Sequence, residues 1–339
     1  MSDNVLEVTE LIKHFEIRKG FLDRVHGHVR AVDGVTFSIR RGETFGLVGE
    51  SGCGKTTIGR TIMRALDPTS GHIRFSPAEA DTYELSAMTR KDLREVRPRI
   101  QMVFQDPFSS LSPRMTIKDI IAEPAWIHRM YGQKESDARV AQLLDDVGLR
   151  PQYMTRYPHA FSGGQRQRIG FARALMTSPD FIVADEPVSA LDVSVQAQIL
   201  ELMVKLREQY SLSYLFISHD LSVVRYICHR IGVMYVGKLF EFGDTEDVFR
   251  TPRHPYTESL LAAVPDLDPA TRDTAEILGG EVADAANPPS GCFFHPRCKY
   301  ARDRCRVEAP ALRSFGGADK SPHRAACHFS EELDLQGVR

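Results

Sequence analysis

A glycine-rich segment at residues 49–56 has the residue types and spacing of a phosphate-binding loop. Glycines let backbone N–H groups turn toward an anion, and the N-terminus of a following helix adds partial positive charge. Lys55 could reach the β- and γ-phosphates of a nucleoside triphosphate, and the Thr56 hydroxyl could ligate Mg²⁺. The residues predicted to hold the nucleotide here are Gly49, Ser51, Gly52, Cys53, Gly54, Lys55, Thr56 and Thr57.

A second glycine-rich segment follows much later in the chain and consists of Phe161, Ser162, Gly163, Gly164 and Gln165. Ser162 is a suitable helix N-cap, and the two glycines expose N–H groups to an approaching anion. An ordinary capped helix without a ligand also explains this segment, because capping residues are common at helix starts. Two glycine-rich segments that could each bind an anion, in one chain, favour an ATPase whose active site is completed when two subunits meet.

Carboxylates follow an apolar run at residues 181–184 that is typical of a buried strand. Asp185 can hold Mg²⁺ there, directly or through water, and Glu186 is placed to orient or deprotonate an attacking water. A second apolar run, residues 214–217, precedes His219, which could contact the γ-phosphate during transfer. Adjacent carboxylates are often only a solvated strand end, and a lone histidine after a strand is usually structural. The functional interpretation therefore depends on the whole set.

The phosphate loop needs a strand and a helix to position it. Residues 44–48 are typical of a short buried strand. Residues 57–66 predict a helix, because Ile58, Ile62 and Leu66 recur on one helical face. A strand, a loop and a helix in this order are the setting that phosphate binding requires.

In their order along the chain, these motifs resemble those of the ATP-binding-cassette (ABC) ATPases. The resemblance covers roughly residues 5 to 250 and includes Gln105 and the segment Ser189-Ala190-Leu191-Asp192. It implies an α/β fold, with a P-loop NTPase core of the ABC type, an antiparallel β subdomain and an inserted helical subdomain. It also implies MgATP hydrolysis at a dimer interface, where residues 161–165 of one subunit close over ATP held by the other.

Individual roles follow from the resemblance by position. Lys55, Gln105, Glu186 and His219 are the expected catalytic residues, with Gln105 sensing Mg²⁺ and the lytic water. Asp192 is expected to communicate across the dimer. The expected Mg²⁺ ligands are Thr56, Gln105 and Asp185, and Phe15 is expected to stack on adenine, although a core aromatic near a first strand is an equal alternative.

The segment after Gln105, residues 106–124, is similar to that of oligopeptide and dipeptide importer ATPases. An insertion at residues 18–30 and the segment His254-Pro255-Tyr256-Thr257 fit the same branch. The resemblance implies a second ATPase subunit, identical or paralogous, two membrane permease subunits and, indirectly, a substrate-binding protein. It implies a peripheral location at the cytoplasmic face of the inner membrane. Nickel importers use closely related ATPases, so nickel or another small solute is the alternative cargo.

Composition and charge bear on the remaining function classes. The chain has 339 residues and a formal net charge of −2, which offers no support for a broad nucleic-acid footprint. A soluble cassette ATPase acting on nucleic acid or ribosomes is therefore a weaker alternative, and such proteins usually carry two cassettes or a coiled-coil insertion. No apolar run is long enough to span a membrane, and residues 1–4 lack the pattern of a signal peptide. We expect a cytosolic protein that meets the membrane through its partners.

The last part of the chain is distinguished by clustered cysteines. Residues 265–290 are rich in proline, alanine and aspartate and predict a linker. We therefore expect a nucleotide-binding domain at 1–264, with its helical subdomain at about 106–176, and a Cys-rich extension at 291–339. The extension holds Cys292, Cys298, Cys305 and Cys327.

Clustered cysteines in a reducing compartment favour a metal site over disulfides. Four thiolates could hold a [4Fe–4S] cluster, and the span from Cys292 to Cys327 carries eight basic against three acidic residues, which would offset its negative charge. Such tails are associated with an iron–sulfur cluster in the importers that this chain resembles. A zinc site that also uses His295, His323 or His328 is the alternative, although no Cys-x-x-Cys pair occurs. Free thiols and a redox or iron sensor are further alternatives.

Overall fold

A computed structural model of the chain describes residues 3–19, 24–78, 80–106, 110–263, 279–315 and 323–338. Its strands are β1 (Asn4–Lys19), β2 (Arg24–Arg40), β3 (Thr44–Val48), β4 (Ser70–Phe75), β5 (Tyr83–Glu84), β6 (Ile100–Val103), β7 (Phe181–Asp185), β8 (Ser213–Ile217), β9 (Arg230–Tyr235), β10 (Lys238–Asp244), β11 (Arg313–Phe315) and β12 (His323–Ala325). Its α-helices are α1 (Lys55–Ile62), α2 (Leu93–Val96), α3 (Ile117–His128), α4 (Gln133–Asp146), α5 (Gly163–Leu175), α6 (Val193–Tyr210), α7 (Leu221–Ile227), α8 (Thr245–Arg250), α9 (Pro255–Ala262) and α10 (Asp303–Val307).

The larger sheet has the strand order β11-β12-β10-β9-β3-β8-β7-β6 within the described residues. From β6 to β9 the neighbouring strands are parallel. Every residue of β3, β7, β8 and β9 is buried, as expected for a parallel sheet covered on both faces. The carboxyl ends of parallel strands lie at one edge, so the segments that follow β3, β6, β7 and β8 can meet there.

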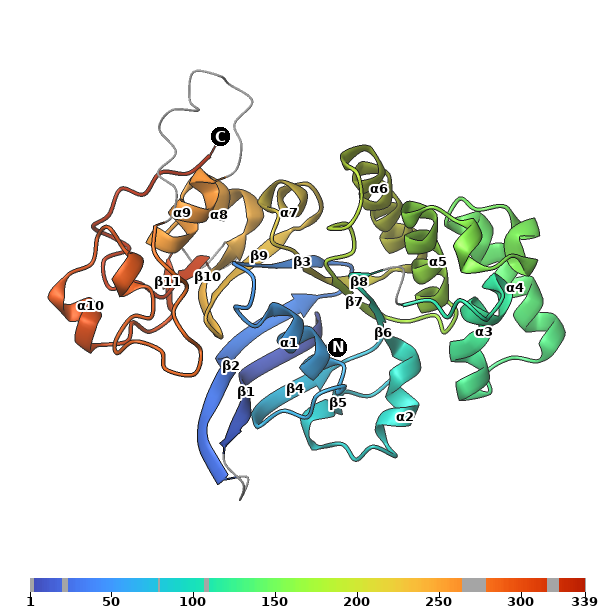
Figure 1. The fold of residues 1–339 in the computed structure, drawn as a ribbon, viewed down its shortest axis with the longest axis horizontal. Coiled ribbons are helices and arrows are strands. Elements are labelled where there is room, and N and C mark those ends of the chain that lie inside the picture. The colour runs from blue at the N-terminus through green and yellow to red at the C-terminus, as the bar shows by residue number, and fades with distance from the viewer. Residues whose placement is uncertain are drawn as a thin grey trace.

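Alternation along β7 assigns its side chains to two cores. Phe181 and Val183 pack in one cluster with residues of β1, β2 and α1, whereas Ile182 and Ala184 pack in another with residues of α3, α4 and α5. Figure 1 shows β1, β2 and α1 on one side of the sheet and helices α5 to α9 on the other. The sheet thereby separates the layer that holds α1 from the layer that holds α5.

A smaller sheet with the order β2-β1-β4-β5 lies over α1 (Figure 1). All of its strand pairs are antiparallel, and the long β1–β2 hairpin dominates it. The antiparallel sheet predicted from the resemblance is therefore present. The insertion at residues 18–30 forms part of this hairpin, apart from residues 20–23, which lie outside the described ranges.

The predicted strand at 44–48 is confirmed, whereas the predicted helix at 57–66 is shifted. Helix α1 begins at Lys55 and ends at Ile62, because Gly54 forms its N-cap and Arg64 takes a positive φ of 51° just beyond it. Ile58 and Ile62 are buried as predicted. Gly59 packs so closely on the sheet that an added Cβ would lie 2.9 Å from Cγ1 of Val183.

Helices α3, α4 and α5 pack together at the end of the molecule beyond β6 (Figure 1). The α3 helix begins after Thr116, whose hydroxyl accepts a hydrogen bond from the backbone N–H of Asp119. At the opposite end of the sheet, β12 pairs with β10, and β11 pairs with β12. The cysteine-rich extension thus adds strands to the edge of the core sheet. Within the described ranges, no helix combines the length and apolar character needed to cross a membrane.

Candidate active site

A cavity of about 520 Å³ lies at the carboxyl edge of the parallel strands, a size suited to a small-molecule ligand. Both the phosphate loop and the segments after β6, β7 and β8 contribute to it. Its lining residues are Val29, Ala31, Ser51, Gly52, Gly54, Lys55, Thr56, Thr57, Gln105, Glu186, His219 and Ala285.

The phosphate loop is held by close backbone packing. Gly54 has a φ of 108°, and an added Cβ would lie 2.0 Å from the carbonyl oxygen of Ala31, so only glycine fits. The buried Lys55 ammonium donates to the backbone carbonyls of Gly49 at 2.7 Å and Glu50 at 2.9 Å. Lys55 therefore lies at the cavity, and its ammonium is held by two carbonyls of the loop backbone.

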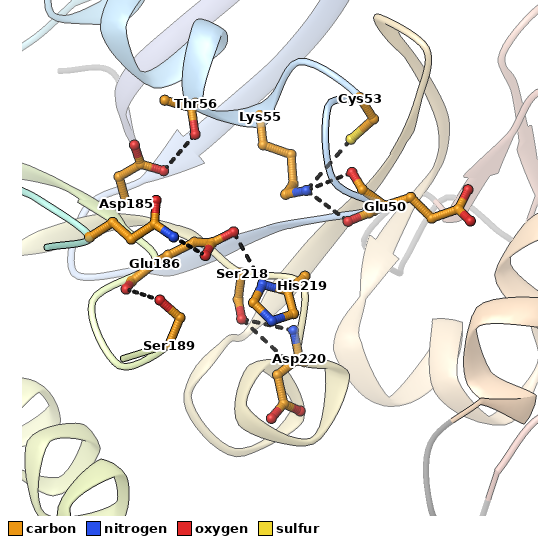
Figure 2. A network of polar contacts seen from close by, with 12 residues as sticks. Glu50, Cys53, Lys55, Thr56, Asp185, Glu186, Ser189, Ser218, His219 and Asp220 are labelled. Carbon is orange, nitrogen blue, oxygen red and sulfur yellow. Dashed lines mark hydrogen bonds and ion pairs between the residues drawn. The ribbon is translucent and has the colours of Figure 1, made fainter. Parts of the chain in front are cut away.

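Thr56 and Asp185 meet across the base of the loop (Figure 2). The Thr56 hydroxyl donates to Oδ1 of Asp185 at 2.9 Å, which joins the first turn of α1 to the end of β7. Burial raises the pKa of Asp185, since its carboxylate lies in a poorly solvated position. Hydroxyl, carboxylate and amide oxygens are suitable donors for Mg²⁺, so Thr56, Asp185 and Gln105 fit such an ion.

Glu186 lies at the centre of a second group of contacts (Figure 2). The Gln105 amide donates to its carboxylate at 2.8 Å, and Nδ1 of His219 lies 3.1 Å from its other oxygen. Its backbone N–H donates to the carbonyl of Ile217 at 2.9 Å, which ties the end of β7 to β8. Glu186 thus contacts two other residues predicted to be catalytic, although the three follow three separate strands, β6, β7 and β8.

The second glycine-rich segment, residues 161–165, does not line this cavity. Ser162 caps α5 in a capping box: its hydroxyl accepts from the Gln165 backbone N–H, and Gln165 accepts from the Ser162 N–H. Gly163 and Gly164 form the first turn of that helix. None of these four residues lines the cavity, and neither does Asp192, the N-cap residue of α6.

Phe15 is not among the residues that line the cavity. It lies opposite Val29 in the β1–β2 register, with an exposed side chain over which the Lys13 ammonium sits at 5.0 Å. The cavity wall here is made by Val29 and Ala31, which the sequence interpretation missed. The available signal was that Val29 and Ala31 alternate with the polar residues His28 and Arg30, a pattern that indicates a strand with one apolar face.

The segment predicted to be a linker contributes a further wall residue. Residues 265–278 of that segment lie outside the described ranges, but Ala285 lines the cavity. Its carbonyl accepts from the backbone N–H of Arg30 at 3.0 Å, and the N–H of Ala283 donates to the Tyr235 hydroxyl at 3.3 Å. The described part of the segment is therefore hydrogen-bonded to β2 and β9.

The four clustered cysteines line one small, largely apolar cavity of about 20 Å³. Burial raises the pKa of Cys292 to about 12 and that of Cys298 to about 11, and it also raises the pKa of Cys327. His295 and His328 also line this cavity, whereas His323 instead contacts the buried carboxylate of Glu241 at 2.6 Å.

The four cysteines fit a metal site in their residue type but not in the size of the cavity between them. Four thiols around one space are a suitable donor set for an iron–sulfur cluster. However, the cavity holds no more than about one water molecule. In the part of the chain that the structure describes, no three Cys, His, Asp or Glu residues are arranged to hold a metal ion.

Comparison with known proteins gives two family matches. The family described as ABC transporter matches residues 32–189, and the family described as oligopeptide/dipeptide transporter, C-terminal region, matches residues 240–305. The oligopeptide transport ATP-binding protein AppF of Bacillus subtilis is 49% identical over 334 residues, covering 96% of this chain and 98% of its own. A putative peptide import ATP-binding protein of Brucella ovis is 49% identical over 323 residues, covering 95% and 97%.

A solved structure is also similar: a dimeric ATP-binding cassette in a post-hydrolysis state with bound ADP and phosphate. It is 26% identical, with a TM-score of 0.61, and the match covers 71% of this chain and 98% of that one.

Proposed function

Since the chain belongs to the ABC transporter ATPases and hydrolyses ATP, we propose that it powers a membrane importer of oligopeptides or dipeptides. The observation that carries the proposal is the single cavity that joins Lys55, Gln105, Glu186 and His219 in a chain whose relatives are named for peptide transport. An importer of nickel or another small solute is the alternative. The weaker alternative is a soluble ATPase acting on nucleic acid or ribosomes.

The catalytic residues act by positioning and by charge stabilisation, as in other phosphoryl-transfer enzymes. Lys55 and the N–H groups of the loop hold the β- and γ-phosphates of ATP. Thr56, Asp185 and Gln105 would hold Mg²⁺, which when bound neutralises charge on the phosphates. Glu186 orients or deprotonates the lytic water, and the His219 ring, kept in place by Glu186, reaches toward the γ-phosphate.

Each active site is completed by a second subunit, identical or paralogous. The N–H groups at the start of α5, in Ser162 to Gln165, contact the γ-phosphate of ATP bound to the partner subunit. Asp192 transmits the state of one site to the other. The position of these residues outside the cavity lining supports this proposal, as does the dimeric state of the similar cassette. Phe15 stacks on adenine beside Val29, where the β1–β2 register supports its placement.

The partners are two permease subunits, with a substrate-binding protein acting through them, and the ATPase sits at the cytoplasmic face of the membrane. The helical subdomain, about 106–176, contacts the permeases; its helices α3, α4 and α5 pack as one group. The nucleotide-binding domain spans 1–264, and the segment 265–290 leads to the extension at 291–339.

Reconstitution tests the cargo. The full chain is purified with its co-purifying subunits, placed in proteoliposomes with ATP, and supplied with a labelled dipeptide, a labelled oligopeptide or ⁶³Ni²⁺. Peptide accumulation that depends on ATP supports the proposal. Uptake of nickel without peptide uptake would establish the alternative, and co-purification with ribosomes would contradict both.

For the cysteine cluster we propose a [4Fe–4S] centre, with zinc as the alternative. The shared cavity of four thiols and the basic surroundings support a cluster. Iron, zinc and acid-labile sulfide are measured on anaerobically purified protein, together with its absorption at about 400 nm. Zinc without iron would select the alternative, and absence of both metals would contradict a metal site.

A further inference from the structure

An ion pair joins the cysteine-rich extension to the phosphate loop. Arg297, next to Cys298, contacts Glu50 with both terminal nitrogens, at 2.7 and 2.9 Å from the two carboxylate oxygens. Such a two-point contact fixes the orientation of both planar groups. Glu50 lies between Gly49 and Ser51 in the phosphate loop, so the extension reaches the loop itself.

The backbone of Glu50 is part of the arrangement that orients Lys55. Its carbonyl accepts from the Lys55 ammonium at 2.9 Å and from the Cys53 N–H at 3.3 Å. Its own N–H donates to the Tyr256 hydroxyl at 2.9 Å. With the side chain held by Arg297, each polar group of Glu50 is fixed, and the peptide that directs Lys55 has little freedom to rotate.

Arg297 is itself firmly placed. Its side chain is only 5% exposed, and its Nε donates to the Gly279 carbonyl at 3.2 Å. The guanidinium also lies 5.9 Å from the ring centre of Tyr235 and 6.0 Å from that of Phe294. The contact with Glu50 raises the pKa of Arg297 further above its usual range, so this charge persists at all working pH values.

We infer that Arg297 is a positioning residue for the phosphate loop, which makes the cysteine-rich extension a working part of the nucleotide site. The extension then affects ATP affinity through two successive contacts: Arg297 holds the Glu50 carboxylate, and the Glu50 carbonyl holds the Lys55 ammonium. If the ion pair were purely structural, its removal would lower the stability of the fold and leave the affinity of the folded protein for ATP unchanged. The inference rests on the proposed role of Lys55 in phosphate binding.

The test compares the full-length chain with the variants Arg297→Gln, Arg297→Lys, Glu50→Gln and the double variant. Dissociation constants for ATP, steady-state KM and kcat, and the nucleotide-free melting temperature are measured for each. We expect Arg297→Gln and Glu50→Gln each to raise the dissociation constant and KM about tenfold, with a smaller change in kcat. The double variant should be no weaker than the single ones, and Arg297→Lys should recover part of the affinity.

A matched control is Arg304→Gln in the same extension. Arg304 makes a similar two-point contact with Glu308, at 2.7 and 2.9 Å, but this pair is exposed, and its helix α10 lies away from β3 and α1, which flank the loop (Figure 1). Unchanged ATP affinity in folded Arg297→Gln protein, or an equal loss in Arg304→Gln, would overturn the inference. A double variant that loses affinity additively would do the same. The variant Lys55→Ala separates the two proposals, because retained ATP binding there contradicts the proposed site, whatever Arg297 does.

Discussion

Glu186 has a φ of 48°, a conformation that costs energy for any residue with a side chain. The backbone hydrogen bond to Ile217 and the contacts with Gln105 and His219 hold it there. Strain of this kind persists where surrounding contacts determine the conformation, and it is common at active sites. At the scale of the residue, these contacts hold the Glu186 carboxylate at the lining of the cavity.

The substitution Glu186→Gln tests this role. We expect ATP hydrolysis to fall at least about a hundredfold, because the amide cannot accept a proton from water. ATP binding should remain, since the amide keeps the size and the hydrogen-bonding position of the carboxylate. Phosphate release and nucleotide binding are measured together, with the exposed Glu95→Gln on α2 as control. Normal turnover in Glu186→Gln protein would remove Glu186 from the mechanism.

At the scale of the element, α1 carries the phosphate loop on a tightly packed interface with β7 and β8. A Cβ at Gly59 would lie 2.9 Å from Val183 and 3.0 Å from Ile217, in a core whose density leaves little room for adjustment. Glycine in a helix interior is normally unfavourable, so its presence here reflects the close approach.

We expect Gly59→Ala to lower the free energy of unfolding by about 1–3 kcal/mol, because the added methyl overpacks the interface. Urea denaturation measures the change. The control is Gly170→Ala on α5, where the added Cβ would meet no atom within 4 Å apart from its chain neighbours and the backbone of its own helix, so we expect a gain of about 0.5–1 kcal/mol from helix propensity. Equal changes in the free energy of unfolding for the two variants would show that the packing of α1 on the sheet does not explain the effect of Gly59→Ala.

A second prediction at this scale concerns His254, the N-cap of α9. Its Nδ1 accepts from the Tyr256 N–H at 3.0 Å, and burial lowers its pKa to about 3, from the usual 6.5. The unfolded chain therefore binds more protons than the folded chain between these values. Neutral His254 therefore makes its full contribution to the free energy of unfolding above about pH 6.5. As the pH falls toward 3, the free energy of unfolding decreases by up to about 1.4 kcal/mol per pH unit.

The variant His254→Asn keeps an N-cap acceptor and removes the titrating group. Free energies of unfolding are measured for both proteins at pH 4, 5, 6 and 7 (chosen within the range of about 3 to 6.5 and just above it). We expect the free energy of unfolding of the variant to change less with pH than that of the unsubstituted protein, by up to about 1.4 kcal/mol per pH unit. Identical slopes would mean that His254 is not a source of acid sensitivity.

At the scale of the whole molecule, the cavity and the segment proposed to contact the partner's ATP are separate in one chain. Lys55 lines the cavity, whereas Ser162 and the start of α5 do not line it. We expect Ser162→Arg, in a Glu186→Gln background, to abolish ATP-dependent dimerisation and to leave ATP binding intact. Sedimentation with and without ATP measures the dimer. Loss of ATP binding as well would indicate that Ser162 serves the site of its own subunit.

The amino-acid sequence by itself determined the residue types of the site and much of its local framework. The phosphate loop, the carboxylates after residues 181–184 and the capped start of α5 depend on short segments, and β3 matches its predicted bounds. Local sequence is sufficient there because strand alternation, capping and glycine spacing act within a few residues. Helix α1 differed from its prediction, since the apolar period continues to Leu66 but the helix ends at Ile62.

Only the tertiary structure decided which distant segments complete the site. Val29 and Ala31 from the long hairpin and Ala285 from the predicted linker form cavity walls, and His323 contacts Glu241, away from the cysteine cavity. Arg297 reaches Glu50 across 247 positions in the chain. The physical reason is that such contacts depend on how the sheets and the extension pack together, and the spacing of residues along the chain carries no information about that packing.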